Sequence, residues 1–166
     1  MEQVALSLGD FELGEVLGGS ENVQHVKYRN ATPPQYYALK RTPLDSEEAA
    51  VLGQLNHRGI VFLHGVFEDH GYRYLCLEFM GGGSLADEQQ AVKLSDVEVV
   101  HYHAEMVLAL EYLHHHRVSI IYRDFHPANM LRDAHGEPSN QVALALFRLL
   151  PSLCSVPVPV LHEITK

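Results

Sequence analysis

The stretch of this chain with the most chemically capable side chains is residues 121–129, which read Ile-Tyr-Arg-Asp-Phe-His-Pro-Ala-Asn. The carboxylate of Asp124 lies five residues before the carboxamide of Asn129, and the imidazole of His126 lies between them. A carboxylate can accept a proton from a hydroxyl group, and a carboxamide oxygen can ligate a hard cation such as Mg²⁺. The pattern therefore indicates acid–base or metal-assisted chemistry in one short loop.

A long amphipathic helix is predicted directly before this loop, over residues 95–116. Ser95 and Glu98 form the sequence Ser-x-x-Glu, which is typical of a helix N-terminus. Large apolar side chains then recur at helical spacing at Val99, Met106, Leu110 and Leu113. We expect this apolar row to lack sufficient cover, because the late segment 142–161 is interrupted by prolines that resist regular structure. The sequence therefore predicts a marginally stable chain that can self-associate through this helix.

Strands are predicted upstream of the helix. Residues 11–17 alternate apolar and polar side chains, and residues 35–40, 61–67 and 72–79 are further apolar stretches bounded by turn residues. Three consecutive glycines, at positions 81–83, then end this part of the chain. The order of elements indicates an α+β fold.

Composition limits the partners and the compartment. The 166 residues carry a formal net charge of -9, whereas nucleic acids and anionic membranes require clustered Lys and Arg, so we expect neither as a partner. The N-terminus lacks a leader pattern, and the most apolar late segment, 142–150, is too short to span a bilayer. Cys76 and Cys154 are too few for a disulfide framework. These features predict a cytoplasmic protein.

Several of these stretches, in this order, resemble parts of the eukaryotic protein kinase family. Residues 121–129 are similar to its catalytic loop, residues 37–40 (Tyr-Ala-Leu-Lys) to the end of its third strand, and residues 75–85 to its fifth strand and hinge. Tyr122 favours the serine/threonine kinases of the AGC group. The resemblance covers about residues 10–136.

The resemblance implies a protein-kinase-like fold with a five-stranded N-lobe and an incomplete helical C-lobe. The N-lobe and hinge would occupy residues 1–80, and the partial C-lobe with the catalytic loop residues 81–137. Residues 138–166 would form a divergent, proline-interrupted tail.

The resemblance also implies ATP and Mg²⁺ as cofactors, with transfer of the γ-phosphoryl group to Ser or Thr of a protein. Asp124 would be the catalytic base and Asn129 a Mg²⁺ ligand, while His126 would lie near the transferred group. The residues implied to bind ATP are Gly18, Gly19, Lys40, Glu48, Glu78 and Met80.

Departures from the family pattern predict weak or absent activity for this chain alone. The glycines at 18 and 19 are adjacent, not spaced, and His126 replaces a lysine. Asp-Phe-Gly, which supplies a Mg²⁺-bridging carboxylate, does not occur. Glu48 follows Lys40 by only eight residues, so it can pair with Lys40 or fold back in a capping box of residues 45–48.

Two alternative functions stay open. One is a non-catalytic, kinase-derived fragment that binds a partner. The other is a small-molecule phosphotransferase, because residues 124–129 also resemble the Asp-x-His-Pro-x-Asn loop of aminoglycoside and choline kinase-like enzymes.

Overall fold

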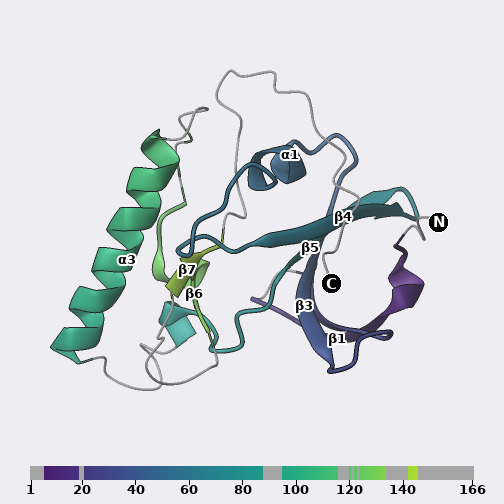
Figure 1. Cartoon of the computed structure of the whole chain (residues 1–166), viewed down its shortest axis with the longest axis horizontal. Helices are drawn as coiled ribbons and strands as arrows, with labels where there is room; N and C mark the ends of the chain where they lie inside the picture. Colours follow the sequence, from purple (N-terminus) through teal and green to yellow (C-terminus); the bar gives the residue numbers. More distant parts are fainter. Residues whose placement is uncertain are drawn as a thin grey trace. The chain divides into compact units, whose positions relative to one another are not determined.

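The computed structural model describes residues 6–18, 21–87, 95–115, 120, 122, 124–133 and 142–145 (Figure 1). The described residues fall into two compact units. The first contains the residues up to 53 together with 63–79, and the second contains 54–62 and the residues from 80 onward. No helix among the described residues is long and apolar enough to cross a membrane.

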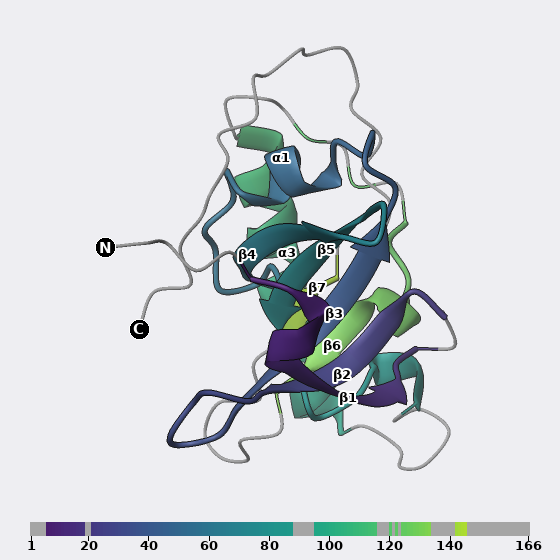
Figure 2. The ribbon, with the colours of Figure 1, turned by 90° about the vertical axis from the view of Figure 1, so that its right-hand side faces the viewer.

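The first unit is built on a five-stranded antiparallel sheet with the strand order β1-β2-β3-β5-β4 (Figure 2). Its strands are β1 (Phe11–Val16), β2 (Val23–Tyr28), β3 (Gln35–Thr42), β4 (Leu63–Asp69) and β5 (Tyr72–Glu78). A short 3-10 helix, η1 (Leu8–Asp10), precedes the sheet, and the five-residue helix α1 (Glu48–Leu52) follows β3. The predicted five-stranded N-lobe is confirmed.

The two faces of this sheet have different chemistry, because alternate side chains of a strand point to opposite faces. One face forms the core of the unit and buries Phe11, Val26, Tyr37, Leu39, Phe67, Tyr74 and Cys76. The aromatic rings of this core stack, with 5.7 Å between the ring centroids of Phe11 and Phe67. Residues 38 and 40 of β3 alternate with this core set, so they belong to the opposite face.

The second unit contains the long helix α3 (Asp96–His115) and a two-stranded sheet of β6 (Met130–Arg132) and β7 (Val142–Leu144). The helix starts as predicted: the backbone N–H of Ser95 donates to Oε2 of Glu98 at 2.8 Å, and the N–H of Glu98 donates to Oγ of Ser95 at 3.3 Å. The expectation that the apolar row lacks cover is wrong for Met106 and Leu113, which are buried. Strand β7 packs against α3, and Figure 1 shows both small strands beside the helix.

The segment of residues 56–61 is held by contacts with α3 and β7. The backbone N–H of Asn56 donates to Oη of Tyr112 at 2.9 Å, and the ring of His57 stacks on Tyr112 with 4.9 Å between centroids. Arg58 makes a bidentate ion pair with the buried carboxylate of Glu105. The N–H of Leu144 donates to the carbonyl of residue 59 at 2.8 Å. These contacts tie the helix, the segment and the small sheet together.

We expect the stability of this unit to depend on the protonation of His57. Burial lowers the pKa of His57, although the Glu105 carboxylate opposes the shift, and its Nδ1 accepts a hydrogen bond from the N–H of Gly59. The unfolded chain, with an ordinary pKa of about 6.5, therefore binds a proton that the folded state resists, and the free energy of unfolding falls as the pH drops below that value. His57→Gln should reduce this fall in urea unfolding measured from pH 7.5 to 5.5.

The matched control is His70→Gln, because the side chain of His70 is 82% exposed. Parallel stability–pH curves for the wild type and His57→Gln would contradict the prediction.

Candidate active site

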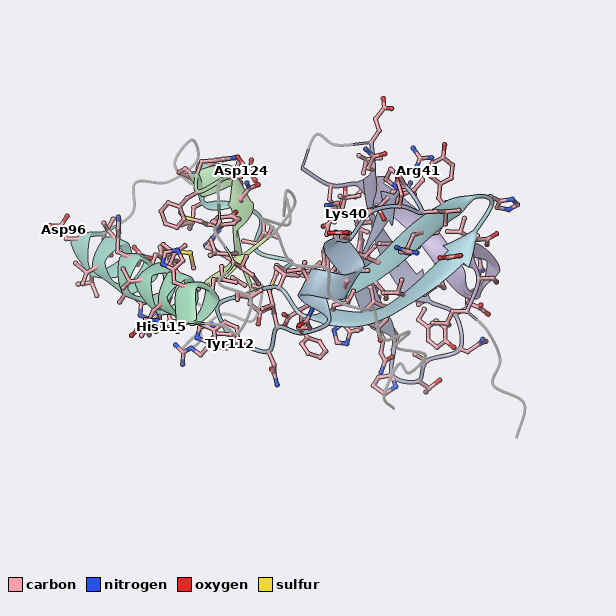
Figure 3. All side chains as sticks on the ribbon, turned by 90° about the horizontal axis from the view of Figure 1, so that it is seen from above. Lys40, Arg41, Asp96, Tyr112, His115 and Asp124 are labelled. Atoms are coloured by element: carbon pink, nitrogen blue, oxygen red, sulfur yellow. The ribbon has the colours of Figure 1, made fainter. Side chains whose placement is uncertain are left out.

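One group of candidate functional residues is a buried ion pair in the first unit. Nζ of Lys40, on β3, lies 2.5 Å from Oε1 of Glu48, and the two side chains are only 10% and 9% exposed. Glu48 is the first residue of α1, and Figure 3 labels Lys40. Of the two arrangements that the sequence left open for the Glu48 carboxylate, the structure shows the one directed at Lys40.

Two effects act in opposite directions on the pKa of Glu48. Burial raises the pKa of Glu48, while the charge and hydrogen bond of Lys40 lower it. Removing two charges from water is costly, so such a pair is weak evidence for stability by itself. Its neighbours across the sheet are apolar, since Val23 and Leu75 lie directly opposite Lys40 on β2 and β5. The arrangement fixes one ammonium group between two apolar neighbours, where it can hold an anionic ligand.

For the other residues implied to bind ATP, the structure gives only their location and backbone conformation. Gly18 has a φ of +63°, a left-handed conformation that favours glycine, and nothing lies within 4 Å of the position that a Cβ would occupy. Gly19 lies outside the described residues. Glu78 is the last residue of β5 in the first unit, whereas Met80 is a buried residue of the second unit.

A separate group of candidate functional residues, within the second unit, is the polar loop that the sequence singled out. Nδ2 of Asn129 donates to the backbone carbonyl and to Oδ2 of Asp124, both at 2.9 Å. Nε2 of His126 lies 3.3 Å from Oδ1 of Asp124 and 3.1 Å from Nδ2 of Asn129. The structure therefore brings the three predicted side chains together within the second unit (Figure 3 labels Asp124). The carboxylate is oriented by its neighbours and half-buried, as a proton acceptor for a hydroxyl group needs to be.

Strand β7 anchors this loop. The loop ends in a 3-10 turn, η2 (Pro127–Asn129), and the carbonyl of Asn129 accepts a hydrogen bond from the N–H of Ala145 at 2.8 Å. Oη of the buried Tyr122 donates to the carbonyl of Ala145 at 3.1 Å, and burial raises the pKa of Tyr122 to about 12. The sequence marked Tyr122 only as a family feature. Its anchoring role depends on a partner 23 residues away and leaves no local signal.

One glycine of the predicted hinge has a close-packing role. The N–H of Gly82 donates to the carbonyl of Arg132 at 2.9 Å, and a Cβ at position 82 would lie 2.7 Å from the carbonyl oxygen of Asp133. Any larger residue would push β6 away, and β6 directly follows the loop that carries Asp124 and Asn129. The run of glycines could have indicated this close approach as well as a chain break.

The described residues do not form a complete Mg²⁺ site. Asp124 and Asn129 offer one carboxylate and one amide oxygen, and the described part of the chain contains no group of three His, Cys, Asp or Glu side chains placed to hold a metal ion. In the family that the sequence resembles, Mg²⁺ is held by the Asn of this loop together with the Asp of an Asp-Phe-Gly segment, and Asp-Phe-Gly does not occur in this sequence. The tripeptide Leu146-Phe147-Arg148, which follows β7 in the sequence, has an apolar leucine where Asp-Phe-Gly has the metal-binding aspartate.

Comparisons with known proteins agree with this geometry. The family model described as protein kinase domain matches residues 6–147. The chain is 34% identical over 139 residues to 3-phosphoinositide-dependent protein kinase 1 of Arabidopsis thaliana, and 37% identical over 140 residues to ribosomal protein S6 kinase alpha-2 of Homo sapiens. It is 32% identical over 143 residues to protein kinase 3 of Dictyostelium discoideum. These matches cover 76%, 76% and 79% of this chain but only 28%, 19% and 16% of the relatives.

The Lys40–Glu48 pair allows a direct test of its energetics. Lys40→Met leaves a buried carboxylate without its cation, which should lower the free energy of unfolding by roughly 3 kcal/mol. The double variant Lys40→Met/Glu48→Leu replaces the pair with apolar side chains and should recover most of this loss, in urea unfolding at pH 7. A double variant no more stable than Lys40→Met would show that the carboxylate is not the source of the loss.

Proposed function

Because this chain belongs to the protein kinase domain family, we propose that it is a serine/threonine kinase-like protein that binds ATP and transfers phosphoryl groups poorly or not at all. The observation that carries the proposal is the buried contact between Lys40 and Glu48. In this family the corresponding pair must be in place for the lysine to hold the nucleotide phosphates. The names of the similar proteins, all kinases, support the same reading.

The reaction would need more than the described residues supply. Asp124 is positioned by Asn129 to accept a hydroxyl proton, and Mg²⁺, when bound, would neutralise charge on the phosphates. We place Leu146-Phe147-Arg148 where the family has Asp-Phe-Gly, since Phe147 is the last residue that the family model matches. Loss of one group that stabilises transition-state charge typically lowers kcat by about 10²–10³-fold. A lower rate of transfer than in the family is therefore expected, while binding through Lys40 is retained.

A second candidate is transfer of a phosphoryl group to a small alcohol. It is favoured by His126, which contacts both Asp124 and Asn129 within the sequence Asp-x-His-Pro-x-Asn. A screen of small alcohols alongside Ser/Thr peptides as acceptors distinguishes the two reactions.

We also propose that one face of α3 binds a second copy of this chain. Four apolar side chains lie on this face: Val97, Val100, Val107 and Leu108. Val97 and Val107 are 79% and 62% exposed, whereas Met106 and Leu113 on the opposite face are buried. The first turn of the helix carries acidic side chains and its last turn carries His114 and His115. In an antiparallel pair the acidic end of one helix would therefore lie beside the histidine end of the other. Patches of this kind commonly mark interaction surfaces.

A cytoplasmic location remains part of the proposal. It is supported by Cys76, a free thiol whose pKa burial raises to about 12, so that it stays protonated and unreactive.

The proposal predicts ATP binding that depends on Lys40 and changes little with Mg²⁺. The double variant Lys40→Met/Glu48→Leu should bind a fluorescent ATP analogue at least about tenfold more weakly, because one charge-assisted contact is worth roughly 1.5–3 kcal/mol. Lys27→Met, which changes a lysine on β2, is the matched control. Titrations with Mg²⁺ and with EDTA should give dissociation constants within about twofold, since the described ligands form an incomplete metal site.

Tight binding that strictly requires Mg²⁺ would contradict this prediction by revealing a further metal ligand. Robust phosphorylation of Ser/Thr peptides that Asp124→Asn abolishes would contradict the proposed loss of transfer.

Self-association should depend on the apolar face of α3. Val100→Glu/Val107→Glu should shift the chain toward monomer in sedimentation velocity, because each carboxylate would have to be desolvated at the contact. Leu13→Glu/Val16→Glu makes the same change at two exposed apolar residues of β1 and serves as the control. A wild-type chain that is monomeric up to about 100 µM, which corresponds to binding energy below roughly 5.5 kcal/mol, would contradict the proposed contact.

A further inference from the structure

The position of Glu48 depends on a short connection. Residues 43–47 lead from β3 to α1, and Glu48 is the first residue of this five-residue helix. A helix this short is not stable alone, so its start must be held by contacts with the rest of the unit. The buried side chains of Ala49, Ala50 and Leu52 hold the body of the helix.

Arg73 of β5 holds the connection itself. Its Nη1 donates to the backbone carbonyl of Ser46 at 2.9 Å. Its Nε and Nη2 donate to Oε1 of Glu68 on β4, at 3.3 and 2.9 Å. Arg73 also lies opposite Thr42, the last residue of β3, whose Oγ1 donates to the Arg73 carbonyl at 3.3 Å. One side chain thus joins two strands of the sheet to the connection.

Ser46 transmits this contact to Glu48. Oγ of Ser46 accepts a hydrogen bond from the N–H of Glu48 at 3.3 Å, and the N–H of Ser46 donates to the carbonyl of Pro43 at 3.1 Å. We propose that Arg73, oriented by Glu68, is a positioning residue for the phosphate-binding lysine, because it fixes Ser46 and thereby holds Glu48 against Lys40. The role in nucleotide binding rests on the proposed function, whereas the positioning of Glu48 by Arg73 does not.

Arginine suits this role better than lysine. A guanidinium presents its N–H donors in a rigid planar fork, and three of its nitrogens are used here on two acceptors in different elements. The consequence is regulatory. In this family, the position of the helix that carries the glutamate can control activity. Here the pair is assembled by contacts within the first unit and needs no helix movement.

The test is a double-mutant cycle on nucleotide binding. Arg73→Gln should weaken binding of the fluorescent ATP analogue by roughly three- to tenfold, the value of about one hydrogen bond. In a Glu48→Gln background the same change should have no further effect, because Arg73 acts through Glu48. A merely structural role would instead weaken binding equally in both backgrounds. The matched control is Arg29→Gln, which removes another bond from an arginine to a backbone carbonyl, that of Phe11, in the same unit.

Hydrogen exchange of the amides of residues 46–52, measured without nucleotide, gives an independent readout. Faster exchange in Arg73→Gln, but not in Arg29→Gln, supports the positioning role, and unchanged exchange overturns it. If the wild type binds no nucleotide, the proposed function fails, while hydrogen exchange still decides the role of Arg73. If Arg73→Gln does not fold, Glu68→Gln, a change at a largely exposed side chain, is used in both measurements with the same expected direction.

Discussion

The register of β3 is the constraint on which the rest of the first unit depends. Tyr37 and Leu39 enter the aromatic core, so Ala38 and Lys40 belong to the opposite face, and pairing with β2 and β5 fixes this alternation. A slip of one residue would place the ammonium of Lys40 in the core and Leu39 on the opposite face. Burying an unpaired charge among these aromatic side chains would cost too much free energy for that register to form. The stacked aromatic core is therefore also what positions Lys40.

The loop of the second unit is positioned by a different mechanism. Its polar side chains satisfy one another, since Asn129 donates to Asp124 and contacts His126, and Tyr122 and β7 hold the backbone. None of these contacts requires a metal ion or a nucleotide. A loop stabilised in this way can keep the geometry of a catalytic site even where the set of metal ligands is incomplete. The presence of Asp124 and Asn129 is therefore stronger evidence that the chain descends from the kinase family than that it catalyses phosphoryl transfer.

The sequence predicted those features whose signals are local. The start of α3 follows from Ser95 and Glu98, and the strands follow from alternation and turns. The burial of Met106 and Leu113 was not predictable from the sequence, because β7, which packs against α3, is at three residues too short to show a period. The interval of eight residues from Lys40 to Glu48 allowed two arrangements. The choice depends on Arg73, which contacts Ser46 from 27 residues away in the sequence and which no sequence pattern marks.

The residues proposed for nucleotide binding and those proposed for phosphoryl transfer are thus assembled separately in this chain. The pair of Lys40 and Glu48 is assembled by β3, α1 and the contacts of Arg73, all within the first unit, and the Asp124 loop is assembled within the second. Because a buried ion pair contributes little net stability, the fold alone gives no reason to keep it where an apolar pair of similar volume would suffice. Its presence fits the proposal that recognition of the nucleotide is the property that depends on Lys40, whether or not a phosphoryl group is transferred.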